Sequence, residues 1–201
     1  MLTKLKRQIQ ALLTSEAAFA HKIGLTPNAV SGLGIILALL AGIAYWRAAT
    51  DEFALALAIV FLLLSGFCDA LDGVLARQYG QITVFGGFLD SLLDRYADTA
   101  VLAGIVLGGL ADFSWGLVAV MGTLLVSYAR ARAEAAGVKM ESIGIAERPE
   151  RILILLVASL VAFGWIGALW WAVVLVAFLT NITVLQRAIY FRQALKKKTE
   201  V

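Results

Sequence analysis

The sequence predicts an all-α integral membrane protein, with six transmembrane helices preceded by an N-terminal amphipathic helix in the membrane interface. Three observations support this fold class. Of the 201 residues, 61% are hydrophobic and the mean hydropathy is +0.88, far above the roughly half apolar content of soluble domains. The apolar residues fall into six stretches, most of them close to the about 20 residues that cross a bilayer. Nearly all basic residues gather on one side of these stretches.

Residues 1–20 differ in pattern from the apolar stretches that follow. Apolar residues at helical spacing alternate with basic and polar ones, namely Leu2, Leu5, Ile9, Leu12 and Leu13 with Lys4, Lys6, Arg7 and Gln8 between them. This pattern predicts a helix in the membrane interface with its basic residues toward anionic head groups. A short helix packed on the rest of the protein is the alternative. We do not expect a cleavable signal peptide, because the segment lacks a continuous apolar core.

The six predicted spans follow one another without a long linker. Their expected bounds are Ala29–Trp46, Phe53–Ala76, Gly86–Leu110, Trp115–Ala136, Arg151–Gly164 and Ile166–Tyr190. The fifth is the shortest, so it is expected either to be tilted or to begin earlier. Because no internal repeat or linker divides the chain, residues 1–201 are expected to form a single membrane domain, with 1–20 as the interfacial helix and 29–190 as a six-helix bundle.

The basic residues predict the orientation of the spans. An even number of spans leaves both ends of the chain on one side, which then carries 16 of the 17 lysines and arginines, and Arg47 alone lies on the other. The positive-inside rule assigns the basic side, with both termini and the 77–86 and 137–150 loops, to the cytoplasm. Tryptophans near the opposite ends indicate an aromatic belt; they are Trp46, Trp115, Trp165, Trp170 and Trp171.

Five aspartates lie where the apolar pattern predicts membrane. Asp69 and Asp72 end the second span, whereas Asp90, Asp94 and Asp98 lie in the third. Charged side chains in a span are costly and usually mark function. Spacings of three and four place each group on one helix face, and the short connecting loop predicts that the two helices are antiparallel neighbours. The carboxylates can therefore meet at the cytoplasmic end.

Carboxylates that face one another repel unless a cation lies between them. The chain has one histidine, His21, and one cysteine, Cys68, so a metal site must rest on carboxylates. Mg²⁺ and Mn²⁺ prefer such hard oxygen ligands, and two ions about 4 Å apart can clamp both oxygens of a displacement at phosphorus. The alternative is a structural network of carboxylates and arginines.

The same residues form a specific motif. Asp69-x-x-Asp72-Gly73-x-x-Ala76-Arg77, then eight residues, then Gly86-x-x-x-Asp90-x-x-x-Asp94 is similar to the complete signature of the CDP-alcohol phosphotransferases. The resemblance implies a membrane enzyme of phospholipid biosynthesis that uses Mg²⁺ or Mn²⁺, with two ions. It implies transfer of a phosphatidyl-type group, diacyl or archaeol, from a CDP-lipid to a polar alcohol with release of CMP.

The resemblance also implies residue roles. The metal ligands would be Asp69, Asp72, Asp90 and Asp94, with Asp94 also the general base. The CDP-lipid would contact Asn28, Ser31, Asp69, Gly73, Ala76, Arg77, Thr83 and Gly86. Pro27 near a helix start leaves free N–H groups that suit phosphate, although helix capping is the alternative for Asn28 and Ser31. Asp98 is expected to orient Arg95 or a metal ligand.

Further segments bear on the acceptor alcohol. Leu89–Asp98, Ser127–Glu134 and Gly144–Arg151 resemble the branch of phosphatidylinositol-phosphate and archaetidylinositol-phosphate synthases. This branch implies inositol 1-phosphate as acceptor, with Arg130 and Arg132 holding its phosphate and Arg187 as a third cation. Positive-inside anchoring is the alternative for Arg130 and Arg132.

Several other questions stay open at this stage. Arg148 and Arg151, with Glu147 and Glu150, fit a surface salt-bridge cluster as well as a site. Glycerol 3-phosphate or serine is the alternative acceptor. A prenyltransferase and a divalent-cation transporter are the alternative functions, but neither accounts for the full motif. The resemblance further implies a homodimer in the cytoplasmic membrane of a prokaryote, and we expect no nucleic-acid partner.

Overall fold

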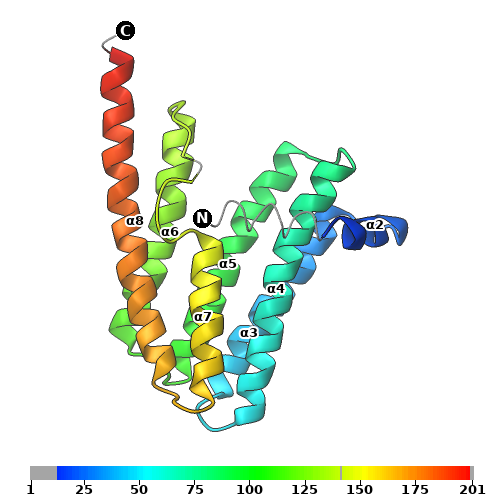
Figure 1. The fold of residues 1–201 in the computed structure, drawn as a ribbon, viewed down its shortest axis with the longest axis vertical. Helices are drawn as coiled ribbons and strands as arrows, with labels where there is room; N and C mark the ends of the chain where they lie inside the picture. The colour runs from blue at the N-terminus through cyan, green and yellow to red at the C-terminus, as the bar shows by residue number, and fades with distance from the viewer. Residues whose placement is uncertain (1–12, 141, 200–201) are drawn as a thin grey trace.

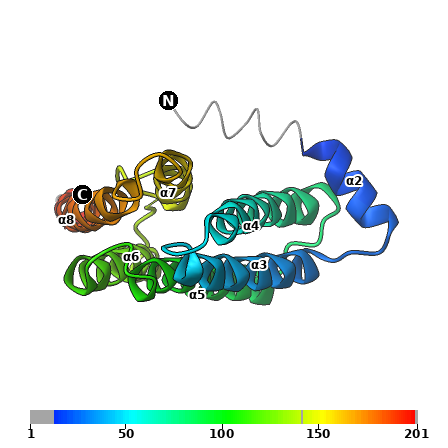
Figure 2. The same ribbon diagram turned by 90° about the horizontal axis from the view of Figure 1, so that it is seen from below.

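The structure, a computed structural model, describes residues 13–140 and 142–199. These residues form seven helices and no strand: α2 (Thr14–Lys22), α3 (Pro27–Arg47), α4 (Glu52–Gln78), α5 (Val84–Leu107), α6 (Phe113–Ala135), α7 (Arg148–Ala162) and α8 (Ala168–Thr199). Helices α3 to α8 run up and down along one direction, and α2 lies across them (Figure 1). Seen from below, α3, α4 and α5 form one group, with α6, α7 and α8 beside it (Figure 2).

Four of these helices are long and apolar enough to cross a membrane, namely α3, α4, α6 and residues Ala168–Lys196 of α8. This confirms the all-α fold and supports its membrane character. Helix α5 carries Asp90, Asp94, Arg95 and Asp98, and α7 has 15 residues, so the count of six spans stays a prediction. The predicted interfacial helix falls mostly on residues 1–12, outside the described residues, and α2 overlaps only its end.

Local sequence explains where several helices begin. Thr26, Asp51 and Thr83 are N-caps, whose side chains accept hydrogen bonds from the backbone N–H of Ala29, Phe53 and Gly86, respectively. Such caps satisfy donors that the first helical turn leaves without a partner.

The last two helices differ from the predicted spans. Helix α7 begins at Arg148 rather than Arg151, with Pro149 in its first turn, where proline is tolerated. Helix α8 continues to Thr199 rather than ending near Tyr190, because no glycine or proline follows that tyrosine.

Helix α3 occupies the centre of its group and packs on both α4 and α5. Its contact with α5 is a close approach of two backbones, since a Cβ added to Gly42 would meet the Ala100 carbonyl, and one added to Gly104 would meet the Gly42 carbonyl. Small residues permit such contacts between helices. Helices α4 and α5 run antiparallel (Figure 1) and their carboxylates meet, as predicted, but neither packs mainly on the other. Both pack mainly on α3, and their acidic faces meet across the site.

The connections between helices alternate between the two ends of the bundle. The α4–α5 and α6–α7 connections lie at the same end as the C-terminal end of α8, while the α3–α4, α5–α6 and α7–α8 connections lie at the opposite end (Figure 1). Arg47 at the end of α3 lies at this opposite end. The two ends therefore differ in charge as the sequence pattern requires.

Candidate active site

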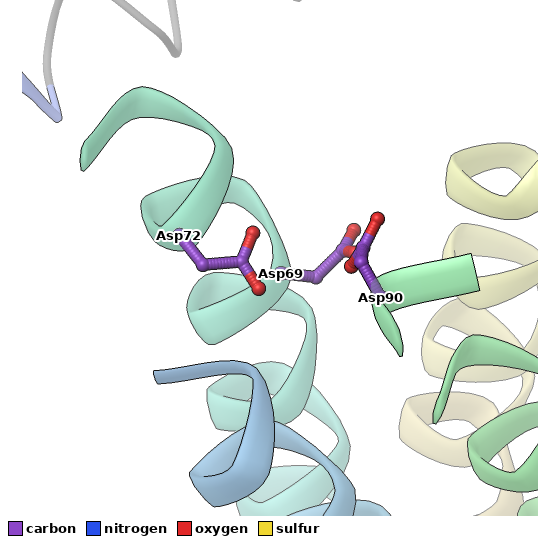
Figure 3. Close-up of side chains that lie close together, drawn as sticks. All are labelled: Asp69, Asp72 and Asp90. Carbon is purple, nitrogen blue, oxygen red and sulfur yellow. The ribbon is translucent and has the colours of Figure 1, made fainter. Parts of the chain in front are cut away.

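Three aspartates from two helices converge near the basic end of the bundle (Figure 3). Asp69 and Asp72 come from α4 and Asp90 comes from α5, and one carboxylate oxygen of each lies within 4.8 Å of the others. Asp72 is buried, and Asp69 and Asp90 are half-buried. Several hard oxygen donors at this spacing fit a Mg²⁺ or Mn²⁺ ion.

Asp94, the fourth predicted ligand, lies one turn further along α5 and stands outside this group of three. It lines the same hollow as the three other aspartates, together with Ser31 and Arg148 among others. Its Oδ1 lies 2.6 Å from Nη1 of Arg148, and its Oδ2 lies 3.4 Å from Nη1 of Arg95. The carboxylate predicted as general base is thus held between two guanidinium groups.

Arg148 extends from the start of α7 into the carboxylate group. Its Nη1 lies 2.5 Å from Oδ1 of Asp69, and its Nε lies 3.4 Å from Oδ1 of Asp98. Asp98 also accepts a 2.5 Å hydrogen bond from Nη2 of Arg151, while Nη1 of Arg151 donates to the Ala146 carbonyl at 3.0 Å.

These contacts decide one open alternative and correct one expectation. Of the two alternatives for Arg148 and Arg151, the surface salt-bridge cluster is wrong, because both pair with the aspartates of α4 and α5. Asp98 does not pair with Arg95, whose Nη1 donates instead to the Ser91 carbonyl at 2.5 Å. From the sequence alone it stayed open whether Arg148 belongs to the site. The available signal was its position directly before an apolar stretch, on the predicted cytoplasmic side.

The start of α3 approaches the aspartates from a third side. Ser31 donates a short hydrogen bond to Asp72, and its hydroxyl also contacts the Pro27 carbonyl at 3.1 Å. The cap of α3 is Thr26, so the capping alternative for Asn28 and Ser31 is wrong.

The glycines of the motif lie under polar side chains. A Cβ added to Gly86 would lie 2.9 Å from Thr83 Oγ1 and 3.2 Å from Asn28 Oδ1, so these three residues meet where α5 begins. A Cβ added to Gly73 would lie 3.2 Å from Nη1 of Arg77. Ala76 is half-buried beside the exposed Arg77. Asn28, Thr83 and Gly86 thus form one group at the start of α5, and Gly73, Ala76 and Arg77 lie together near the end of α4.

The three arginines predicted for the acceptor have different surroundings. Arg130 and Arg132 are exposed near the end of α6, and Arg130 pairs with Glu134 at 2.9 Å. Arg187 of α8 is only 3% exposed and donates to the carbonyls of Ile143 at 2.8 Å and Val126 at 2.5 Å. Among the described residues, none of the three pairs with an aspartate.

Helix α8 also fixes the segment that leads into Arg148. Thr183 Oγ1 accepts hydrogen bonds from the backbone N–H of Ile145 at 3.3 Å and of Ala146 at 3.1 Å. Nη2 of Arg187 lies 3.6 Å from Oε1 of Glu147. The backbone before Arg148 is therefore tied to α8, which holds the arginine at the aspartates.

Comparisons with known proteins agree with this geometry. The sequence profile of a family described as CDP-alcohol phosphatidyltransferase matches residues 24–180. An archaetidylinositol phosphate synthase from Pyrococcus horikoshii is 41% identical over 187 residues, which cover 93% of this chain and 94% of the relative.

Solved structures of a related enzyme have a similar fold. The crystal structure of the phosphatidylinositol phosphate synthase of Mycobacterium tuberculosis with CDP-DAG bound superposes with a TM-score of 0.77 at 29% identity, covering 90% of this chain and 94% of that one. The same enzyme in complex with manganese and citrate gives a TM-score of 0.76 at 29% identity, covering 89% and 88%.

Proposed function

Because the chain belongs to the CDP-alcohol phosphatidyltransferase family, we propose that it transfers a phosphatidyl-type group from a CDP-lipid to inositol 1-phosphate and releases CMP. The meeting of Asp69, Asp72 and Asp90, all from the family motif, carries this proposal. The names of the relatives support inositol phosphate as the acceptor. The lipid is either diacyl or archaeol.

The metal site would consist of Asp69, Asp72, Asp90 and Asp94, with two Mg²⁺ or Mn²⁺ ions. The 4.8 Å grouping of carboxylate oxygens and the manganese in the related structure support this proposal. When bound, the ions would offset the charge of the diphosphate and of the departing phosphate oxygen.

The reaction is a displacement at phosphorus. The acceptor hydroxyl oxygen bonds to the lipid-linked phosphorus, the bond from that phosphorus to the CMP oxygen breaks, and Asp94 takes the hydroxyl proton. The contact of Asp94 with Nη1 of Arg95, at 3.4 Å, helps to fix the direction of the Asp94 carboxylate. Positioning of this kind supplies a large part of catalysis.

The CDP group would bind along the rim formed by the starts of α3 and α5 and the end of α4. Arg77 would contact a phosphate, and Gly73 leaves room for its guanidinium. Asn28, Thr83 and Gly86 lie close to one another, and Ser31 is tied to Asp72. The remaining contacts would come from Asp69 and Ala76.

The acceptor phosphate would bind to cations near the end of α6 and to Arg187 within α8. Arg130 and Arg132 are exposed and can form bidentate contacts with a phosphate. Arg187 is a third cation of this group, and its hydrogen bonds to the Ile143 and Val126 carbonyls support a role in shaping it. We further propose six spans, a cytoplasmic site with both termini on that side, and a homodimer.

The test is a CMP-release assay on purified protein in detergent or lipid. The protein is incubated with Mg²⁺, with CDP-archaeol or CDP-diacylglycerol, and with one acceptor at a time. Release with inositol 1-phosphate is the expected result. Release with only glycerol 3-phosphate or serine would keep the reaction and overturn the acceptor. Failure with every acceptor, despite metal binding, would favour the divalent-cation transporter.

A further inference from the structure

Arg148 is a cation placed among the proposed metal ligands. Its side chain is 14% exposed, and a single nitrogen, Nη1, lies 2.5 Å from an oxygen of Asp69 and 2.6 Å from an oxygen of Asp94. An oxygen in contact with a guanidinium has less capacity to bind a second cation. Arg148 and a divalent ion would therefore compete for these two carboxylates.

The negative charge of the carboxylate cluster explains the position of Arg148, because it needs a positive charge nearby. Asp69, Asp72, Asp90 and Asp94 line one hollow, and buried carboxylates without a cation repel one another and lose solvation. Among the carboxylates of the described residues, Arg95 contacts only that of Asp94, at the longer distance of 3.4 Å. Arg148 alone among the described arginines bridges carboxylates of both α4 and α5.

Asp98 offers a second carboxylate next to the guanidinium. Arg148 lines the hollow of the aspartates and also a second hollow, where Asp98 and Arg151 are the other charged residues. Its Nε lies 3.4 Å from Asp98. A rotation of the side chain toward Asp98 would keep the charge paired without moving α7.

We infer that Arg148 is a built-in counter-ion of the carboxylate cluster, and that a divalent ion binding to Asp69 and Asp94 displaces its guanidinium toward Asp98. The inference rests on the proposed metal site. Arg148 then holds α4, α5 and α7 together when the ion is out, and it weakens the affinity of the site for the ion. A weaker affinity would allow the ion to enter and leave the site together with the substrates.

The test measures Mn²⁺ binding from the room-temperature EPR signal of free Mn²⁺. Arg148→Gln is expected to bind Mn²⁺ roughly tenfold more tightly than the unchanged protein, the effect of one charge a few ångströms away. Arg148→Lys keeps the charge but is too short to bridge both carboxylates, so its affinity is expected between the two. Arg47→Gln, the same charge change at the far end, is the control and should not change the affinity. Equal or weaker binding in both Arg148 variants would overturn the inference.

A second readout does not depend on the affinity. Without metal, Arg148→Gln should unfold at a lower temperature than Arg47→Gln, and Mn²⁺ should raise its melting temperature more than that of the unchanged protein. If Arg148→Gln does not fold, Arg148→Lys is compared with the unchanged protein instead. Tighter Mn²⁺ binding by Arg148→Lys supports the inference, and equal or weaker binding overturns it.

The metal site and the role of Arg148 can fail separately. Asp90→Asn removes a proposed ligand but leaves the contacts of Arg148 with Asp69 and Asp94. If Asp90→Asn binds Mn²⁺ as well as the unchanged protein, the proposed site is wrong. If Asp90→Asn loses binding and the Arg148 variants bind no more tightly than the unchanged protein, only the role of Arg148 is wrong.

Discussion

The two ends of the bundle hold their helices together by different means. At the end of the bundle near Arg47, the backbones of α3 and α5 touch at Gly42 and Gly104. There Tyr45 and Ser159 also share a buried 2.6 Å hydrogen bond between α3 and α7. At the site end, α4, α5 and α7 meet through the ion pairs of Asp69, Asp94 and Asp98 with arginines.

This difference indicates a division of labour along the helices. Close backbone contacts make a rigid scaffold, whereas carboxylates held apart leave space for ions and phosphates. Helix α3 takes part in both ends, since Gly42 belongs to the scaffold and Ser31 bonds to Asp72. Substitutions at the two ends should therefore affect different properties, namely activity at one and stability at the other.

The largest effect is expected at the site end, for Asp94→Asn. Because the amide cannot take the acceptor proton, CMP release should fall by about 10²–10⁴-fold, while CDP-lipid still raises the melting temperature. Asp112→Asn, at the other end, is the control and should keep full activity. Full activity in Asp94→Asn would remove Asp94 from the reaction.

The next largest effect is expected on stability, at the close contact of α3 and α5. A methyl group at Gly104 would overlap the Gly42 carbonyl, so Gly104→Ala should lower the stability by about 1–3 kcal/mol. Thermal unfolding in detergent measures this loss. Gly32→Ala, where no atom lies within 4 Å of the added Cβ, is the matched control. An equal melting temperature for the two variants would contradict the close contact of α3 and α5.

A smaller and more specific effect is expected at the rim. Gly86→Ala would place a methyl 2.9 Å from Thr83 Oγ1, so the KM for the CDP-lipid should rise by about tenfold, the cost of roughly 1.4 kcal/mol. Gly87→Ala, with open space around the added Cβ, should leave the KM unchanged. If both variants behave alike, Gly86 does not serve the nucleotide.

The smallest effect is expected for Tyr45→Phe. The variant loses the hydrogen bond to Ser159 but keeps the ring, so the stability should fall by about 1 kcal/mol with no change in CMP release. A loss of activity larger than the loss of stability would mean that the two ends of the bundle are coupled.

Much of the fold was predictable because its signals are local. Hydropathy and cap residues such as Thr26 and Thr83 mark the helices, and spacings of three and four place Asp69, Asp72 and Asp90 on facing surfaces. The central position of α3 was not predictable, because the contact of Gly42 with Gly104 joins residues far apart in the chain.

The role of the α7 arginines was not predictable for the same reason. Arg148 and Arg151 look like ordinary basic residues beside an apolar stretch, and their partner Asp98 lies about 50 positions earlier. Only the folded arrangement of α4, α5 and α7 brings these charges together.

The central claim is that the aspartates of α4 and α5 form a metal-dependent transferase site. The most direct measurement is CMP release from a CDP-lipid with inositol 1-phosphate and Mg²⁺, for the unchanged protein and Asp90→Asn side by side. We predict release that EDTA abolishes and that Asp90→Asn lacks. Equal release by the two proteins, or release that EDTA does not affect, would contradict the claim.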